Sequence, residues 1–344
     1  MATTTPFRER IGRPLFLALI FLGVTTVHAG DYAADFTRIG VGARAMAMGG
    51  AYVAVANDAS ASYWNPAGAV AGGALALQVE HMPMFAGLAQ YNTAGAHLAF
   101  NAQTSVSINW IRLGVDDIPR YDALLGSRYD RYTTGVNRST GEATGWFADR
   151  EDALFLTFRR SMLLDLAIGG DIAGTVIPTE IAFGVTGKYI HQALDSYTGS
   201  GQGLDAGVLV RFMPGWVDEP EPRTWLSLGA SIRDLSRTQM SWNTASNHKD
   251  EIARGLQAGV ALSHTLPALR LRITAAYDRL FWNEEGNCAG AELKFFNLLS
   301  VRGGYYRSEL TAGAGLNLAG FSLDYAFVGS DLGNSHRITG AFHL

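Results

Sequence analysis

Apolar and polar side chains alternate with a period of two along most of this chain. Between residues 104 and 110, Val106, Ile108 and Trp110 fall on one face, whereas the serines and the asparagine between them fall on the other. Successive side chains of a β-strand point to opposite faces, while helical spacing would mix the two sets. The pattern therefore predicts β-strands, and it recurs as far as the carboxyl terminus.

Fourteen segments of this kind predict fourteen strands. They span residues 75–82, 91–101, 104–114, 151–162, 180–193, 203–213, 223–233, 254–265, 268–281, 288–297, 299–307, 310–318, 320–328 and 335–344. An apolar stretch from Leu163 to Ile177 is interpreted either as an extra strand or as part of a bent loop. An even number of antiparallel strands lets a barrel close with both of its ends on one side.

A soluble β-sandwich and a transmembrane barrel both alternate, so strand length and aromatic residues decide between them. The predicted strands reach about ten residues, the span of a tilted membrane strand. Aromatic residues near strand ends are typical of interfacial girdles. Those near the predicted ends are Trp110, Tyr189, Trp225, Tyr277, Phe281, Trp282, Tyr325 and Phe342. We predict an all-β fold, a transmembrane antiparallel β-barrel of about 14 strands, with a soluble sandwich as the alternative.

The joins between the predicted strands differ in length. Outer-membrane barrels have short periplasmic turns and longer extracellular loops. We expect the short joins at Leu266–Pro267 and Ser308–Glu309 to face the periplasm, and the long polar stretches Val115–Glu151 and Ser236–Glu251 to lie outside the cell as candidate binding loops. The aspartates of the first long loop do not follow the spacing of a calcium-binding loop. They are Asp116, Asp117, Asp122 and Asp130.

The amino terminus has the features of a signal peptide. Arginines at positions 8, 10 and 13 precede an apolar run from Leu15 to Val24, which is too short to span a bilayer. Small residues lead to a predicted cleavage site after Ala29. Residues 1–29 are therefore predicted to direct export and to be removed. An uncleaved inner-membrane anchor is the alternative.

Composition and charge narrow the class of protein. The chain holds 40 Gly, 13 Tyr and 7 Trp but only 10 Pro, and no apolar run outside the leader is long enough for a transmembrane helix. The formal net charge of -4 becomes about -6 without the leader, which argues against a nucleic-acid partner. The single cysteine, Cys288, cannot form an internal disulfide.

Motifs for catalysis or cofactor binding are lacking. Gly40, Gly42 and Ala45 match the spacing G-x-G-x-x-A, but the apolar strand and βαβ unit of a dinucleotide-binding turn do not accompany them. No G-x-S-x-G elbow occurs, and the eight histidines have no metal-ligand spacing. We predict a protein without enzyme activity, cofactor or metal. An outer-membrane lipid hydrolase, with serine and histidine brought together from different strands, is the enzymatic alternative.

Charged residues of both signs occupy the polar faces of the predicted strands. In a membrane barrel these faces line the lumen, because the apolar faces meet lipid. The predicted lumen charges are Lys188, Asp205, Arg211, Arg233, Arg270, Arg272, Asp278, Glu292, Lys294, Arg302, Asp324 and Arg337. A charge-selective open pore would carry one sign. The mixture predicts a narrow or plugged interior that is cross-linked by ion pairs.

Residues 40–70, ahead of the first predicted strand, lack strand alternation and form a candidate plug. The alanines and methionines from Ala43 to Met48 favour a short helix, the Gly49–Gly50 pair ends it, and Asn65–Pro66 forms a turn. Small side chains allow tight packing inside a lumen. We therefore divide the mature chain into a hatch of residues 30–72 and a barrel of residues 73–344.

Short motifs in this segment carry a resemblance to a known family. They are Gly42-Ala43-Arg44-Ala45, Met48-Gly49-Gly50-Ala51, Asn57-Asp58-Ala59 and Tyr63-Trp64-Asn65-Pro66-Ala67-Gly68. They resemble the amino-terminal hatch of the FadL-like outer-membrane superfamily, and within it the PorV/PorQ family, which includes components of the type IX secretion system. Supporting motifs are Gly187-Lys188-Tyr189, Ser241-Trp242-Asn243 and the stretch from Asp324 to Arg337. The chain ends on Leu344, where such barrels usually end on phenylalanine.

The resemblance implies a 14-stranded outer-membrane barrel that is plugged by its amino-terminal segment. It implies a non-enzymatic role in protein export and surface attachment, or alternatively a channel for small hydrophobic molecules. The hatch residues implied in gating or binding are Gly42, Arg44, Gly49, Gly50, Asn57, Asp58, Asn65 and Pro66. The implied partners are outer-membrane lipid, secreted proteins or secretion-system components, hydrophobic small molecules and the barrel-assembly machinery.

Overall fold

The computed structural model describes the chain between residues 33 and 344, with some gaps. The described residues are 33–68, 74–121, 127, 129, 143–168, 175–215, 222–281, 285–330 and 333–344. The predicted cleavage site at Ala29, the boundaries of the predicted hatch and the predicted girdle residue Trp282 lie outside these residues. The predicted signal peptide and domain limits therefore stay predictions.

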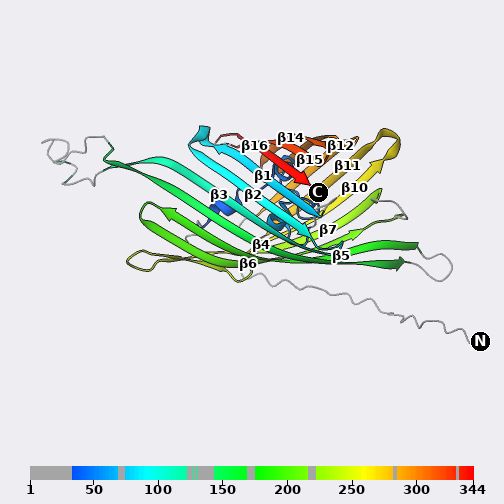
Figure 1. The fold of residues 1–344 in the computed structure, drawn as a ribbon, viewed down its shortest axis with the longest axis horizontal. Coiled ribbons are helices and arrows are strands. Elements are labelled where there is room, and N and C mark those ends of the chain that lie inside the picture. The colour runs from blue at the N-terminus through cyan, green and yellow to red at the C-terminus, as the bar shows by residue number, and fades with distance from the viewer. Residues whose placement is uncertain are drawn as a thin grey trace, which may run out of the picture. The chain divides into compact units, whose positions relative to one another are not determined.

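Fourteen antiparallel strands form a closed barrel (Figure 1). They are β1 (Leu75–Met84), β2 (Ala89–Ala99), β3 (Thr104–Arg120), β4 (Gly145–Ile168), β5 (Thr175–Leu194), β6 (Tyr197–Phe212), β7 (Thr224–Arg233), β10 (Gly255–Leu266), β11 (Leu271–Phe281), β12 (Gly286–Phe295), β13 (Leu299–Tyr306), β14 (Glu309–Leu318), β15 (Phe321–Val328) and β16 (Ser335–His343). Each strand pairs with its neighbours in this order, and β1 closes the barrel on β16. The predicted all-β barrel and its strand number are confirmed.

Two segments expected to be loops are partly strand in the described residues. The segment Ser236–Glu251 contains β8 (Thr238–Trp242) and most of β9 (Lys249–Ile252). These two strands form a hairpin, and β8 pairs with the amino-terminal part of β6. The segment Val115–Glu151 is shortened at both ends, because β3 continues to Arg120 and β4 begins at Gly145. The strands continue there because their backbones pair with neighbouring strands, although their side chains no longer alternate between apolar and polar.

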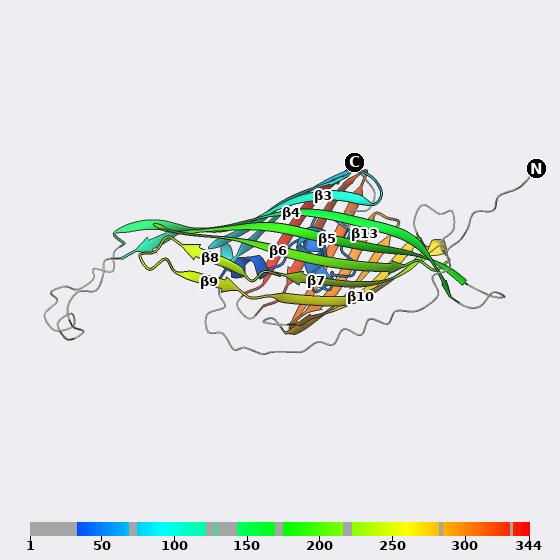
Figure 2. The same cartoon turned by 90° about the horizontal axis from the view of Figure 1, so that it is seen from below.

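The apolar stretch Leu163–Ile177 is neither an extra strand nor a bent loop in its described residues. Leu163–Ile168 continues β4, and Thr175–Ile177 begins β5, so that the two halves form one hairpin. β4 and β5 are 24 and 20 residues long, whereas β13 and β15 on the opposite wall have 8 each. One wall of the barrel therefore extends well beyond the other, as Figure 2 shows for β3 to β6.

The two short joins lie at opposite ends of the barrel. The Pro267–Leu269 turn (η3) lies at the end where β1 starts and β16 finishes. The Ser308–Glu309 join lies at the other end, with the long loop after β3. This is because β13 begins at the end where β1 starts and finishes at the opposite end. The prediction that both joins face the same side is wrong, since strand direction and not join length fixes the side.

Apolar residues face outward on the barrel and polar residues face inward. On β1, Val79 is 61% exposed, whereas the neighbouring Glu80 is 4% exposed. On β4, Leu156 is 62% exposed and Thr157 is buried. A water-soluble sandwich would bury the apolar faces, while a barrel that spans a membrane presents them to lipid. The surface is therefore that of a membrane barrel.

Most of the predicted girdle aromatics that the structure describes face outward, although only Phe281 and Phe342 of these stand within one residue of a strand end, and Trp225 faces the lumen. It lies on the lumen face of β7, is 8% exposed, and has the guanidinium of Arg211 5.1 Å from its ring centroid. The position of Trp225 one residue inside the strand start decides its direction, because a shift of one residue exchanges the two faces.

Residues 33–68 fill the lumen as the predicted hatch (Figures 1 and 2). They form η1 (Asp35–Arg38), α1 (Ala43–Ala47) and α2 (Ala61–Trp64), and outside the hatch η2 (Phe85–Gly87) follows β1. The predicted short helix corresponds to α1, and Gly49 and Gly50 end it with φ of 63° and 67°. The second hatch helix, α2, is not predicted from the sequence. No described helix is long and apolar enough to cross a membrane.

Candidate functional site

The hatch is fastened to the barrel wall by a chain of charges that begins at Arg44 in α1. The guanidinium of Arg44 donates two hydrogen bonds of 2.9 Å to the carboxylate of Glu292 on β12. Glu292 also accepts from Nε of Arg302 on β13 at 2.6 Å, and Arg302 in turn donates to Asp324 on β15 at 2.6 Å. Each buried charge therefore has an opposite charge beside it, which offsets its desolvation.

The other side of Arg44 contacts polar groups of the hatch itself. Its Nη1 donates to the Tyr52 hydroxyl at 2.9 Å and to the Asn57 side chain, and it lies 3.9 Å from Asp58. Burial raises the pKa of the Tyr52 hydroxyl well above its ordinary value, so the hydroxyl stays protonated and donates to Asp58. Asp58 also accepts from the backbone N–H and the hydroxyl of Ser60.

A second anchor holds the start of α1 against β1 and β16. Glu80 accepts from the backbone N–H of Gly42 and from the Thr339 hydroxyl, which itself accepts from the Ala43 N–H at 2.9 Å. Arg337 lies 3.4 Å from Glu80 and donates to the carbonyl of Gly40 at 2.8 Å. The wall thus satisfies the backbone groups that a short buried helix leaves without partners.

A third anchor uses Asp278 on β11. Its Oδ2 accepts from the backbone N–H groups of Tyr52 and Val53 at 2.7 and 2.8 Å and from the Gln257 amide at 2.8 Å. The carboxylate lies where a side chain at Gly259, its partner across the strand pair, would otherwise stand. Glycine at position 259 therefore makes room for the contact.

Paired glycines on the wall allow the hatch backbone to approach closely. Gly290 on β12 faces Gly304 on β13, and a Cβ atom at either position would fall within 2.6 Å of the Met48 carbonyl carbon. Gly184 on β5 faces Gly207 on β6 in the same way, against Pro66. The hatch is therefore seated on two pairs of glycines on different parts of the wall.

Asn65 and Pro66 form the predicted turn after α2 and bind the long wall. The Asn65 amide donates to the carbonyl of Val53 at 2.8 Å and to the carbonyl of Val208 on β6 at 3.1 Å. Arg159 on β4 donates to the Ala67 carbonyl at 3.1 Å and pairs with Glu180. This turn links the hatch to the strands that extend farthest.

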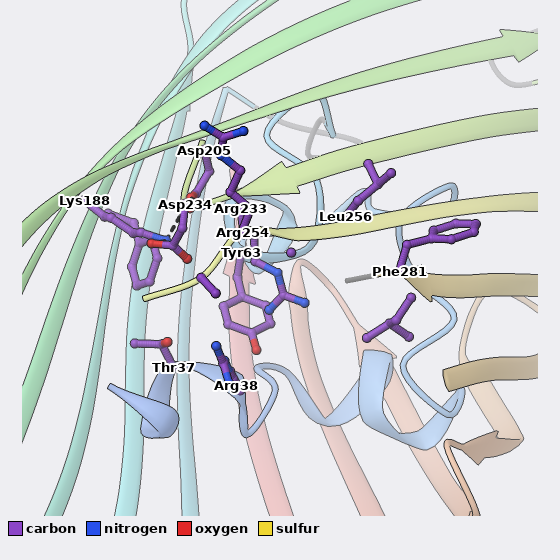
Figure 3. Close-up of a pocket in the computed structure, with 14 residues that line it drawn as sticks. Thr37, Arg38, Tyr63, Lys188, Asp205, Arg233, Asp234, Arg254, Leu256 and Phe281 are labelled. Carbon is purple, nitrogen blue, oxygen red and sulfur yellow. Dashed lines mark hydrogen bonds and ion pairs between the residues drawn. The ribbon is translucent and has the colours of Figure 1, made fainter. Parts of the chain in front are cut away.

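A pocket lies between the hatch and the barrel end that carries the long loops (Figure 3). Tyr63, Phe155, Leu256, Leu280 and Phe281 supply its apolar and aromatic lining. The guanidinium groups at its edge come from Arg38, Arg233 and Arg254. Its present volume of about 30 Å³ holds a single water molecule. A larger ligand would enter only after the hatch or the surrounding wall moves.

One side of this pocket is closed by a buried cluster around Lys188. The ammonium of Lys188 lies 2.8 Å from Asp205 on β6 and 2.8 Å from Asp234 after β7 (Figure 3). Asp234 also accepts from the Thr238 hydroxyl at 2.6 Å, and its N–H donates to Asp205. The cluster pins the bulge of residues 234–237, where the chain leaves β7 and bends into β8.

A polar cavity of about 370 Å³ lies on the opposite side of the hatch, toward the barrel end where β1 starts and β16 finishes. Arg44, Glu292, Arg302 and Asp324 face it together with asparagines, serines and threonines of the short strands. Arg272 and Lys294, two of the predicted lumen charges, line it as well. The hatch therefore separates a pocket with both apolar and charged lining residues from a polar cavity.

The predicted hatch residues occupy three different places. Arg44, Asn57 and Asp58 meet in one polar network, Gly42 and Gly49–Gly50 contact the wall through their backbone, and Asn65 and Pro66 form the turn at the long wall. Among the predicted lumen charges, Arg270 is misplaced. It lies exposed in the turn after η3 with φ of 47°, because β11 begins at Leu271, three residues later than the predicted strand 268–281.

Sequence reasoning missed two residues that hold the hatch, Glu80 and Arg159. Glu80 stands at an inward position of the predicted strand 75–82, next to Gln78, and this alternation would have placed it in the lumen. Arg159 alternates in the same way on β4. No group of His, Cys, Asp and Glu side chains suited to a metal ion occurs in the described ranges.

Comparison with known proteins finds likeness in structure but not in sequence. No family model and no curated protein matches the chain. The toluene transporter TodX of P. putida is 11% identical, with a TM-score of 0.47, over 89% of this chain and 99% of that one. The translocator domain of autotransporter NalP from Neisseria meningitidis is 14% identical, with a TM-score of 0.34, over 79% and 89%. At such identities the likeness concerns the fold alone.

Proposed function

We propose that this protein is a non-enzymatic outer-membrane channel that admits small hydrophobic molecules past its hatch. The observation that carries the proposal is the pocket, where Tyr63, Phe155, Leu256, Leu280 and Phe281 place apolar and aromatic side chains beside charged groups. An apolar molecule held against these side chains would lose its contact with water.

The arrangement of the hatch supports a gated channel. The hatch separates the pocket from the polar cavity, and it is held by discrete ion pairs and hydrogen bonds in addition to its packing. Because the pocket now has a volume of about 30 Å³, passage requires displacement of hatch residues or of the bulge next to Lys188. Because Arg38, Arg233 and Arg254 place guanidinium groups at the pocket edge, we expect the charge of a solute to affect its passage.

The interpretation of the chain as an export component of PorV/PorQ type stays a second prediction without a specific supporting observation. It requires the loop between β3 and β4 as a dock for secreted proteins. Most of that loop lies outside the described residues.

Uptake by whole cells tests the channel. Cells with an intact lipopolysaccharide leaflet would express the full chain, since a plain phospholipid bilayer passes apolar molecules unaided. We expect faster uptake of labelled toluene and octanoate and unchanged uptake of labelled sucrose. Toluene and octanoate differ in the carboxylate, so their ratio reports on the arginines.

A pair of leucine variants controls for folding. Leu280→Gln places an amide in the pocket, whereas Leu235→Gln changes an exposed leucine on the nearby bulge. We expect only the first to slow uptake, with both variants showing the heat-modifiable electrophoretic mobility of a folded barrel. Equal uptake by wild type, Leu280→Gln and cells without the protein would rule out the channel.

A further inference from the structure

The hairpin of β4 and β5 projects beyond the expected lipid-facing belt at the barrel end where β1 starts and β16 finishes. Trp110, Leu154 and Tyr189 are direct neighbours across β3, β4 and β5 and mark one edge of the belt. An apolar belt of about 25 Å corresponds to about ten residues of a strand that rises about 3.3 Å per residue and is tilted by about 40°. On β4 it therefore ends near Leu164, and the rest of the hairpin lies past it.

Both faces of this projecting hairpin, residues 162–168 and 175–178, are apolar and exposed. Ile168 on the outward face is 53% exposed, and Leu163 and Val176 on the inward face are 56% and 54% exposed. A lipid surface would cover one face and leave the other in water. An isolated two-stranded ribbon is also only marginally stable in water. The hairpin therefore has the character of a segment that a protein partner covers.

Beyond Ser161, the backbone of the β4 edge is bonded to no other strand within the described residues. The last bond to the β3 side is from the Ser161 N–H to the Gln103 carbonyl at 2.8 Å. Backbone groups alternate in direction along a strand, so those of Leu163, Asp165 and Ala167 point to this edge. In the described part of the chain no strand pairs with β4 there. Residues 162–168 contain no proline or lysine, the residues that commonly block such an edge.

The other edge is less suited to pairing. On β5, the Pro178 carbonyl accepts from the Met213 N–H at 2.9 Å, and proline itself has no N–H to offer. Only the backbone of Val176 remains on that side within the described strand. Within the described residues, the β4 edge therefore offers more backbone groups to an added strand than the β5 edge does.

We propose that the β4 edge, Met162–Ile168, binds an extended apolar segment of another protein as an added β-strand, with a basic side chain of that segment opposite Asp165. Strand addition satisfies the free backbone groups, and alternate apolar side chains extend both faces of the ribbon. Asp165 is the single charge of this edge and is exposed. A second copy of the chain is disfavoured, because antiparallel pairing centred on this edge places Asp165 opposite Asp165.

The probe is a fluorescent nine-residue peptide of alternating threonine and valine with a central lysine, added to the full chain in lipid nanodiscs. We expect saturable binding by fluorescence anisotropy. Ala167→Pro removes one edge N–H and should abolish binding, whereas Ala167→Ser keeps the N–H and should not change it. Asp165→Lys should weaken binding at least tenfold, and a peptide with central glutamate should restore it. Asp116→Lys, at the opposite end of the barrel, is the matched charge control and should bind as wild type.

Four results would overturn the proposal. The first is equal binding of the peptide to Ala167→Pro and Ala167→Ser. The second is peptide binding that does not change when Asp165 is replaced by lysine or the central lysine of the peptide by glutamate. The third is quenching by brominated phospholipid of bimane attached at Ile168→Cys and at Val176→Cys, which would show that lipid covers both faces. Cys288 is buried, so the introduced thiol is the reactive one. Dimers that dissociate in Ala167→Pro during sedimentation would identify a second copy as the occupant, against the proposal. Heat-modifiable mobility verifies that each variant folds.

Discussion

Arg44 of the hatch and Glu292 of the barrel form a two-point ion pair across more than 240 residues of sequence, with both bonds at 2.9 Å. Glu292 is 3% exposed and Arg44 is 20% exposed at the side chain. The pair joins a five-residue helix to a transmembrane strand. It is the central contact of the network that continues through Arg302 to Asp324.

Loss of the Arg44 guanidinium should loosen the hatch. We expect Arg44→Gln to lower the free energy of unfolding by about 3 kcal/mol, the low end for a broken buried pair because Arg44 keeps some exposure. It should also raise single-channel conductance and expose the hatch to chymotrypsin. Arg150→Gln, which breaks an exposed pair with Asp116, should change stability by less than about 0.5 kcal/mol. Unchanged conductance in Arg44→Gln would show that packing alone holds the hatch.

Glycines of the wall that contact the hatch should tolerate alanine less well than neighbouring glycines that do not contact it. Gly304 faces the hatch backbone, while the nearest atom to a Cβ at Gly303 is 4.0 Å away, the Thr311 carbonyl oxygen. We expect Gly304→Ala to cost about 1–3 kcal/mol of stability through overpacking, and Gly303→Ala to be neutral. Urea unfolding of both variants in micelles measures the difference. Equal costs would mean that the hatch can shift to accept a methyl group.

Asp278 should act through its acceptor oxygen. Asp278→Ala leaves the N–H groups of Tyr52 and Val53 buried without partners, at about 1–3 kcal/mol for each. Asp278→Asn keeps an oxygen in place and should cost less. Hydrogen exchange at these two amides is the measurement, with faster exchange expected in Asp278→Ala alone. Identical protection in both variants would contradict this role.

The Lys188 cluster should show strong coupling. Lys188→Met leaves Asp205 and Asp234 together in a buried site and should destabilise the barrel by about 3–5 kcal/mol. The triple variant Lys188→Met, Asp205→Asn, Asp234→Asn removes the uncompensated charges and should recover most of this loss. Thermal unfolding of the single and triple variants checks the expectation. Additive losses would show that the three side chains act independently.

The periodicity of the sequence determined the strands of the barrel and the side on which most residues lie. This was possible because a strand alternates strictly between two faces. The neighbours of a residue in the sequence are therefore enough to assign it to the outer or the lumen face. The same local logic identified α1 and the Gly49–Gly50 turn. It failed at Arg270 and Trp225, one residue beyond or within a strand end, where the register of the neighbouring strand decides the direction.

Only the tertiary structure decided what holds the hatch and where the barrel can bind other molecules. Glu292, Asp278 and Glu80 look alike in sequence, yet each receives a different part of the hatch because the closure of fourteen strands brings β1, β11 and β12 around it. The projecting edge of β4 likewise depends on where β3 begins. Alternation reports which face a residue occupies, whereas partners across the lumen follow from the shear and closure of the whole sheet.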